Sequence, residues 1–334
     1  MRGLKSRLVF YGGLLLGAAF CVVYATNMPG ESFASSGGLP PPTPELRESA
    51  ARLRGHVTIL AGDIGIRTTD RQPKLDSARD YLVSQLARSE DASRRTQLED
   101  LGVSGEHAQN VVFEVAGTRG AAVIVVGAHY DSIDSGPGAN DNGSGVAATL
   151  ELAASFAQSP AANNVRFVFF ANEEPPYFKN PGMGSLVDVA NAKRRGDPIR
   201  AMLSLETIGC YSDAPDSQHY PWPVGLFYPN RGNFLGFVGD TAMRGLVRSS
   251  IAAFRSAEPF PSQGAALPAF FPGVDWSDHW SFRQAGYPAI MLTDTALFRD
   301  RNYHRASDTP DQLDYLALAR VTRGIAAVIR HLAD

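Results

Sequence analysis

The chain alternates short apolar runs with segments in which apolar residues recur every three or four positions. The runs are rich in β-branched and aromatic residues and are bounded by polar or glycine-containing turns, which is typical of buried strands. Strands are predicted at residues 110–115, 123–126, 165–170, 201–205 and 289–292, with an edge strand at 224–228. Helices are predicted from residue 45, after Thr43 and Pro44, and at residues 76–87, 146–157, 277–285 and 315–332.

The order of these elements indicates the fold class. Predicted strands and helices alternate and no internal repeat is visible, so we expect an α/β fold with a mostly parallel sheet. A length of 334 residues with 44% hydrophobic residues is sufficient for a large core. Residues 45–334 are expected to form one domain.

The first 44 residues have a different character. Arg2, Lys5 and Arg7 precede an uncharged apolar stretch, residues 8–25, whose length is near the minimum of about 17 residues for a membrane span. We therefore expect residues 1–26 to be an uncleaved anchor, with the domain exported to the periplasm or the cell exterior. The alternative is a signal peptide cleaved near Ala25, which would give a secreted protein. Residues 27–44, rich in Pro, Gly and Ser, are predicted to be a spacer.

Composition excludes several classes of function. The formal net charge of −3 and a pI near 6.2 give no electrostatic reason to expect a nucleic-acid partner. Two cysteines cannot build a disulfide framework. The sequence has no HExxH or GxSxG motif, which argues against zincin and serine-hydrolase mechanisms. The oligomeric state is left open.

Residue types that bind metals follow the predicted strands. His129, the pair Glu173 and Glu174, and Glu206 each come after a strand, and His304 lies in the loop after a fourth. Because the carboxyl ends of parallel strands meet at one edge of the sheet, these side chains are expected to converge. A single acid at a strand end is more commonly a helix cap or turn residue. Four such strand ends favour a metal site, and imidazole with carboxylate suits zinc.

Five separated motifs resemble the M28 family of zinc aminopeptidases. They are GAHYDS at 127–132, NDNGSG at 140–145, NEE at 172–174, the segment around Glu206, and YHRASDTPD at 303–311. SDHW at 277–280 also resembles a family motif. The resemblance covers residues 105–332 and implies a three-layer α/β/α fold with a mixed, mostly parallel sheet. It further implies peptide substrates, cleavage at the N-terminal peptide bond and two Zn²⁺ ions per chain.

The resemblance also assigns metal ligands. It implies that His129 and Asp141 bind zinc, with Asp141 bridging the two ions, and that Glu174, Glu206 and His304 complete the set. Glu206 departs from the best-known members, which have aspartate there, so its reach differs by one methylene group. Cobalt or manganese in place of zinc is left open.

Three further residues are expected to act in catalysis. The resemblance implies that Glu173 is the general base, that Asp131 orients His129, and that Tyr303 polarises the substrate carbonyl. General chemistry agrees with this division, because a ligating histidine needs an acceptor for its second nitrogen. A carboxylate that is not tied up by metal is also needed to move the proton of the attacking water.

Other readings stay open from the sequence. A glutaminyl cyclase, which resembles the same fold, would use one zinc ion to form N-terminal pyroglutamate, and a receptor on the peptidase fold would be non-catalytic. Asp278 and His279 are expected either to join a hydrogen-bond network near the site or to cap a helix. Asp308 is expected either to orient His304 or to form a turn. Aromatic residues line a specificity pocket or belong to the core: Tyr177, Phe178, Tyr211, Phe270, Phe271, Trp276 and Trp280.

Overall fold

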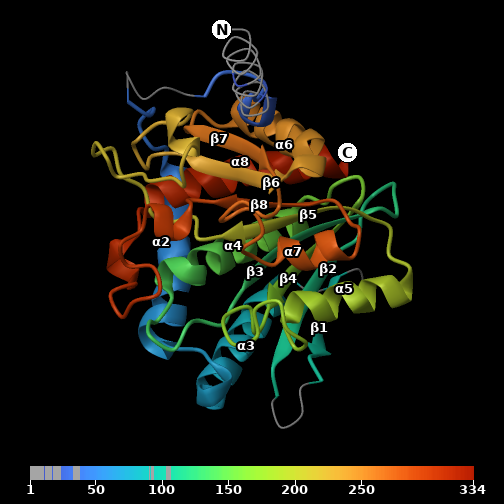
Figure 1. Ribbon diagram of the computed structural model, residues 1–334. Coiled ribbons are helices and arrows are strands. Elements are labelled where there is room, and N and C mark those ends of the chain that lie inside the picture. Colours follow the sequence, from blue (N-terminus) through green and yellow to red (C-terminus); the bar gives the residue numbers. More distant parts are fainter. Residues whose placement is uncertain are drawn as a thin grey trace, which may run out of the picture.

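The computed structural model describes residues 11, 17, 24–32, 38–89, 91, 94–102 and 107–334, and its centre is a single large sheet (Figure 1). Within these residues the sheet has eight strands. They are β1 (Arg94–Asp100), β2 (Gln109–Val115), β3 (Val123–His129), β4 (Asn164–Phe170), β5 (Ile199–Glu206), β6 (Leu235–Asp240), β7 (Ser262–Leu267) and β8 (Ala289–Thr293).

The strand order from one edge to the other is β1-β2-β4-β3-β5-β8-β6-β7. The four central strands, β4, β3, β5 and β8, are parallel to their neighbours within this group. Strands β1 and β2 pair antiparallel at one side, and β6 pairs antiparallel with β8 while remaining parallel to β7. The carboxyl ends of the four central strands therefore lie at one edge, where the predicted ligands are attached.

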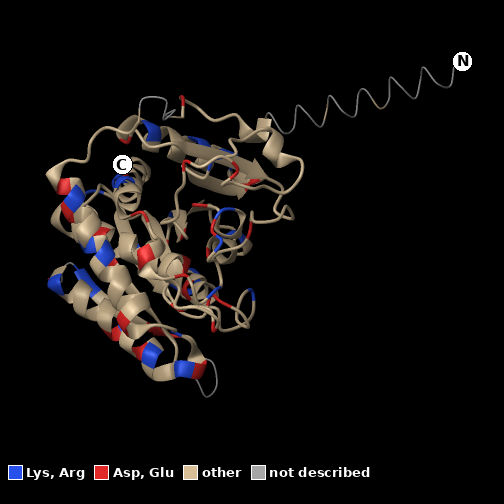
Figure 2. Cartoon of the chain, turned by 90° about the vertical axis from the view of Figure 1, so that its left-hand side faces the viewer, with Lys and Arg blue, Asp and Glu red and all other residues tan. Residues whose placement is uncertain are grey.

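Helices cover both faces of the sheet. They are α2 (Pro44–Val57), α3 (Gln72–Leu86), α4 (Gly145–Gln158), α5 (Gly184–Arg195), α6 (Arg244–Ala257), α7 (His279–Gln284) and α8 (Tyr315–Ala333). Helix α2 begins as predicted, because the Thr43 hydroxyl accepts a hydrogen bond from the Leu46 amide at 3.3 Å and Pro44 occupies the first turn. Basic and acidic residues are interspersed along the helices on one side of the molecule (Figure 2).

Two apolar clusters fill the space on either side of the sheet. Successive residues of β3 point to opposite faces, so Ile124 and Val126 join the larger cluster while Val123 and Val125 join the smaller one. Residues of α2, α3, α4, α6 and α8 belong to the larger cluster, and residues of α5 and α7 to the smaller. The result is the predicted three-layer α/β/α arrangement, with β3 buried on both faces.

The five predicted buried strands are present, and each is one to three residues longer than the predicted apolar run. The pattern did not predict α5, α6, β1, β6 or β7. The sequences of β6 and β7, LGFVGD and SQGAAL, contain glycine or small residues, and β1, RRTQLED, is a polar edge strand. These strands are held by their neighbours rather than by their own propensity.

The prediction of an edge strand at residues 224–228 is wrong. Val224–Leu226 forms a short 3-10 turn instead. The amides of Val224, Leu226 and Phe227 donate to the carbonyls of Pro221, Pro223 and Val224, so they are used within local turns and do not pair with a neighbouring strand.

The predicted membrane segment, residues 8–25, lies almost entirely outside the described residues. Among the helices that the structure does describe, none combines the length and the apolar character needed to cross a bilayer. The described part of the predicted spacer lies against the domain: the Arg255 guanidinium donates to the carbonyls of Pro29 at 3.0 Å and Gly30 at 2.8 Å. The Arg320 side chain also donates to the Pro40 carbonyl.

A buried arginine holds together the loops in front of the sheet edge. Arg67 is 0% exposed, and its backbone exchanges hydrogen bonds with Ser132. Its guanidinium donates to five backbone carbonyls: those of Leu60, Gly65, Tyr130, Pro137 and Gly138. Burial lowers the pKa of Arg67 to about 10, so the side chain stays charged at neutral pH. It thereby fixes the glycine-rich loop that leads to Asp141.

We expect Arg67→Met to lower the free energy of unfolding by roughly 3–5 kcal/mol, because it leaves several buried carbonyls without a donor. Urea unfolding followed by circular dichroism measures the change. The matched control is Arg71→Met, since the Arg71 side chain is 54% exposed and 3.9 Å from Asp134; its effect should stay within about 0.5 kcal/mol. If Arg67→Met changed the free energy of unfolding as little as the control, the hydrogen bonds of Arg67 would not be what holds these loops together.

Candidate metal centre

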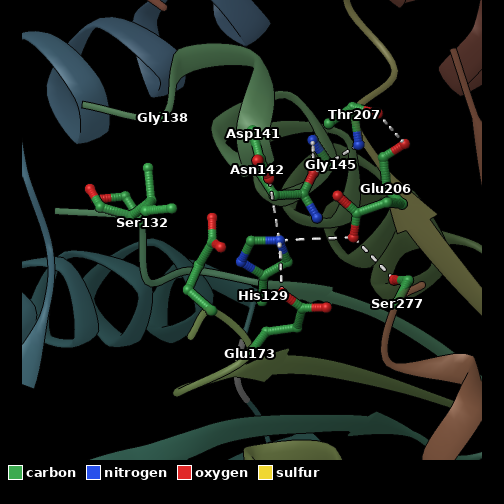
Figure 3. A network of polar contacts seen from close by, with 12 residues as sticks. His129, Ser132, Gly138, Asp141, Asn142, Gly145, Glu173, Glu206, Thr207 and Ser277 are labelled. Carbon is green, nitrogen blue, oxygen red and sulfur yellow. Dashed lines mark hydrogen bonds and ion pairs between the residues drawn. The ribbon is translucent and has the colours of Figure 1, made fainter. Parts of the chain in front are cut away.

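The predicted ligands converge at the carboxyl edge of the central strands. His129 and Glu206 are the last residues of β3 and β5, and these strands are neighbours. Glu173 follows β4, the neighbour of β3 on its other side. Figure 3 shows the side chains of His129, Asp141, Glu173 and Glu206 pointing toward one another. The parallel register of the strands therefore assembles residues that are far apart in the sequence.

The donor atoms form two groups that share Asp141. In the first, the His129 Nε2 atom lies 3.3 Å from Asp141 Oδ1 and 3.5 Å from Glu206 Oε2. In the second, the His304 Nε2 atom lies 3.0 Å from Asp141 Oδ2 and 3.3 Å from Glu174 Oε2. The ligand atoms of each group lie within 4.8 Å of one another, which is close enough to hold an ion. The two oxygens of Asp141 face different groups, as a bridging carboxylate requires.

The hydrogen bonding of these atoms fits a metal. Within the described part of the chain, both ring nitrogens of His129, Nε2 of His304, Oδ2 of Asp141 and Oε1 of Glu174 are buried and have no hydrogen-bond partner. Buried polar atoms in folded proteins are nearly always paired, so a cluster of unpaired donors and acceptors calls for a ligand. Imidazole and carboxylate together are the donor set that zinc prefers.

The charges point to the same conclusion. Burial raises the pKa of Glu173 well above its usual value and that of Glu174 to about 7. Burial lowers the pKa of His129, but the carboxylates of Glu206 and Glu173 outweigh this effect and raise it well above normal. Several carboxylates thus crowd a buried space with only two imidazoles to balance them. A divalent cation bound there would supply the missing positive charge.

Asp131 supports both sides of this cluster. Its two carboxylate oxygens accept hydrogen bonds from the backbone amides of Glu173 and Glu174, each at 3.1 Å. Its Oδ1 atom is also 3.5 Å from Nδ1 of His129. Glu173 belongs to neither donor group, and its Oε2 atom lies 3.8 Å from His129 Nε2. Asp131 therefore lies beside His129 and holds the backbone of Glu173 and Glu174, and Glu173 is a buried carboxylate next to the two donor groups.

The turn that carries Asp141 is held by a second aspartate. The Asp308 carboxylate accepts hydrogen bonds from the amides of Asn140 at 2.8 Å and Asp141 at 3.1 Å. Asp308 therefore positions the turn that carries Asp141, and no contact with His304 is present among the described hydrogen bonds and ion pairs. Of the two roles that the sequence left open for Asp308, these contacts favour the turn.

Ser277 is a functional neighbour that the sequence reading missed. Its hydroxyl donates to Glu206 Oε2 at 2.8 Å (Figure 3). The same hydroxyl lies 2.7 Å from the Ser204 hydroxyl. Only its place at the start of SDHW could have indicated this role. Asp278 and His279 are buried beside it; burial raises the pKa of Asp278 to about 7 and lowers that of His279 to about 4. Neither caps α7 through its side chain: α7 starts after Asp278 without a side-chain cap, and His279 Nε2 contacts the Val274 carbonyl at 2.8 Å.

An apolar pocket opens beside the donor groups. Its volume is about 860 Å³, part of it open to solvent, and both Glu206 and Tyr303 line it. Tyr303 stacks on His304 with ring centroids 3.9 Å apart. Of the seven aromatic residues that the sequence suggested for a specificity pocket, Phe271 and Trp276 line it. The other five are not among the described residues that line this pocket: Tyr177, Phe178, Tyr211, Phe270 and Trp280. Glu206 is the only charged residue among those walls, so the pocket suits an apolar group next to the metal centre.

Comparisons with known proteins agree with the geometry. The chain is 36% identical to the uncharacterized protein YfbL of Escherichia coli over 86% of this chain and 90% of that protein. It is 30% identical to the probable lipoprotein aminopeptidase LpqL of Mycobacterium tuberculosis over 66% of this chain and 45% of that protein. The chain thus spans about half the length of this aminopeptidase.

Solved structures show the same fold at low sequence identity. LapB from Legionella pneumophila matches with a TM-score of 0.70 and 18% identity over 95% of this chain and 80% of that chain. A glutaminyl cyclase from Bacteroides thetaiotaomicron matches with a TM-score of 0.63 and 18% identity, over 88% of this chain and 99% of that chain. The fold alone therefore does not separate peptidase from cyclase.

The family model decides the membership. The model of peptidase family M28 matches residues 110–329, which contain β2 to β8 and both donor groups. With ligand types at the ends of β3 and β5 and after β4 and β8, and with this match along two thirds of its length, the chain belongs to peptidase family M28.

Proposed function

We propose that this chain is a zinc-dependent aminopeptidase that hydrolyses the N-terminal bond of peptides. The observation that carries the proposal is the pair of donor groups joined at Asp141, with the carboxylate of Glu173 beside them but outside both. His129, Asp141 and Glu206 would hold one ion, and Asp141, Glu174 and His304 the other. Zinc, when bound, lowers the pKa of water toward 7 and polarises a carbonyl.

The protein's own groups would handle the proton. Glu173, which is buried beside the donor groups, would accept the proton of the attacking water and deliver it to the leaving amine. Asp131 accepts hydrogen bonds from the backbone amides of Glu173 and Glu174 and lies 3.5 Å from Nδ1 of His129, so it would keep the base and the ligands in a constant geometry. Tyr303 lines the same pocket as Glu206. Its hydroxyl group would donate a hydrogen bond to the substrate carbonyl oxygen and so polarise the carbonyl.

The test combines metal content with two substrates. The purified chain should contain two zinc ions by elemental analysis, and it should hydrolyse leucine p-nitroanilide until a chelator removes the metal. A glutaminyl cyclase would instead release ammonia from glutamine-initiated peptides with one zinc ion. Zinc-loaded protein that processes neither substrate would favour the non-catalytic reading.

The pocket predicts a preference for apolar N-terminal residues. Ala265 is on β7 and lines the pocket, so Ala265→Phe should fill part of it. We expect kcat/KM for leucine p-nitroanilide to fall roughly 10- to 100-fold. Alanine p-nitroanilide has a smaller side chain and serves as the internal control, so its kcat/KM should change little. Equal losses for the two substrates would show that the pocket does not hold the N-terminal side chain.

The location of the enzyme is a separate proposal. Because basic residues precede the apolar stretch at residues 8–25, we propose that this stretch anchors the protein and that the domain lies outside the cytoplasm. Ala25 is 6% exposed in the folded domain, which supports retention of the chain through this residue. Intact-mass measurement of the membrane-extracted protein distinguishes an anchor from a cleaved signal peptide.

A further inference from the structure

Two uncharged loops project large apolar side chains into solvent. Residues 220–228 and 268–273 contain no Asp, Glu, Lys, Arg or His. Trp222 is 85% exposed, Leu226 76%, Phe227 41% and Phe270 89%. We call these four side chains the apolar rim. Large apolar groups gathered on a surface commonly mark a contact with a membrane or a partner.

The apolar rim lies where the N-terminal segment joins the domain. Ala25 is buried in one small apolar cluster with Val224, Leu267 and Val274, and Phe271 packs against this cluster. Val224 belongs to the first loop, and Phe271 to the second. The inner residues of both loops therefore pack with the last residue of the predicted apolar stretch, and the exposed residues belong to the same two loops.

The N-terminal segment is firmly attached there. The Arg244 side chain donates to the Tyr24 carbonyl at 2.9 Å, and its guanidinium lies 3.7 Å from the centre of the Tyr24 ring. The Ser262 amide donates to the Ser32 hydroxyl at 3.0 Å. Figure 1 shows the described part of this segment, in blue at the top, beside α6 and β7. The docked residues Tyr24 and Ala25 are the last two of the apolar stretch, so the described residues that follow it, 26–32, start at the surface of the domain.

We propose that the apolar rim rests in the headgroup region of the membrane in which the N-terminal segment is anchored. The inference rests on the proposed anchor. A short, fixed connection holds the rim within reach of the bilayer surface, and tryptophan and phenylalanine are favoured at this depth. The absence of charge from both loops removes the main penalty for entering it.

This placement has a consequence for substrate access. Tyr220, Val224 and Phe271, from the inner sides of the same loops, line the apolar pocket beside Glu206. The pocket would therefore open close to the membrane surface. Peptides whose apolar N-termini partition to that surface would be concentrated where the enzyme can bind them.

The test uses the fluorescence of Trp222 in the full-length protein. The chain has three tryptophans, at 222, 276 and 280, so the W276F/W280F variant retains Trp222 alone. The matched control W222F/W276F retains Trp280, which belongs to neither loop and whose ring centre lies 5.2 Å from the Lys179 ammonium group. Each variant is reconstituted into phosphatidylcholine vesicles with or without brominated acyl chains, and flotation is measured on the same samples.

We expect bromination to quench Trp222 at least twofold and to leave Trp280 nearly unchanged. Protein that floats with the vesicles while Trp222 stays unquenched would keep the anchor and overturn the membrane contact of the rim. Shielding of Trp222 from acrylamide that grows with protein concentration, without quenching by bromine, would assign the rim to a second copy and also overturn it. Failure to float would overturn both the anchor and the contact. The leucine p-nitroanilide assay tests the peptidase proposal independently of all these outcomes.

Discussion

Replacing Glu173 with glutamine should lower kcat by about 10²- to 10⁴-fold while the zinc content stays unchanged. The amide preserves the shape of the side chain but cannot accept the proton of the attacking water. Because Glu173 lies outside both donor groups, the ligands of the metal are expected to remain in place. Steady-state kinetics on leucine p-nitroanilide and elemental analysis of the same preparation measure the two effects.

The control for this change is Glu151→Gln. Glu151 is also partly buried, but it belongs to α4 and pairs with Arg52 at 2.8 Å, away from the donor groups. This variant should retain wild-type kcat. An active Glu173→Gln enzyme would refute the role of the base, and a Glu173→Gln protein that loses zinc would show that Glu173 is a ligand.

Replacing Asp141 with asparagine should remove zinc from both sites at once. Each oxygen of Asp141 faces one of the two histidines, so the substitution deletes a charged ligand from both groups. Peptidase activity should fall to background. The stabilisation of the wild-type protein by zinc, about 2.7 kcal/mol at a hundredfold excess over Kd, should disappear from thermal melts.

Two comparisons make this prediction specific. Asp134→Asn changes a carboxylate of the same loop whose side chain is 63% exposed, so it should keep both ions. His304→Ala removes a ligand from the second group alone and should reduce the zinc content from two ions to one. Equal zinc content in Asp141→Asn and the wild-type protein would contradict the shared-ligand geometry.

The agreement between sequence and structure is closest where burial is complete. The strand that ends at His129 is apolar on both faces, and only the central position of a sheet covered by helices on both sides explains such a pattern. The prediction that the M28 motifs mark a peptidase of this family is confirmed by the family match. The roles of Glu173, Asp131 and Tyr303 remain predictions that the variants above test.

Tertiary contacts override local pattern in the parts that were missed. β6 and β7 have small residues and glycines, yet they form strands because β8 and α6 provide partners and cover. Residues 224–228 look like a strand by composition, but their apolar side chains form a pocket wall and part of the apolar rim. A stretch of apolar residues indicates burial or contact without specifying which surface supplies it.

The sequence by itself determined the alternation of strands and helices, the α/β class and the residue types that gather at the strand ends. These follow from local periodicity and from the chemistry of single side chains. Only the tertiary structure decided that Asp141 faces two histidines, that Asp308 holds its turn, that Ser277 binds Glu206, and that Arg67 ties five carbonyls. Each of these depends on the distance between segments far apart along the chain, which is set by sheet register and loop packing and leaves no periodic trace in the sequence.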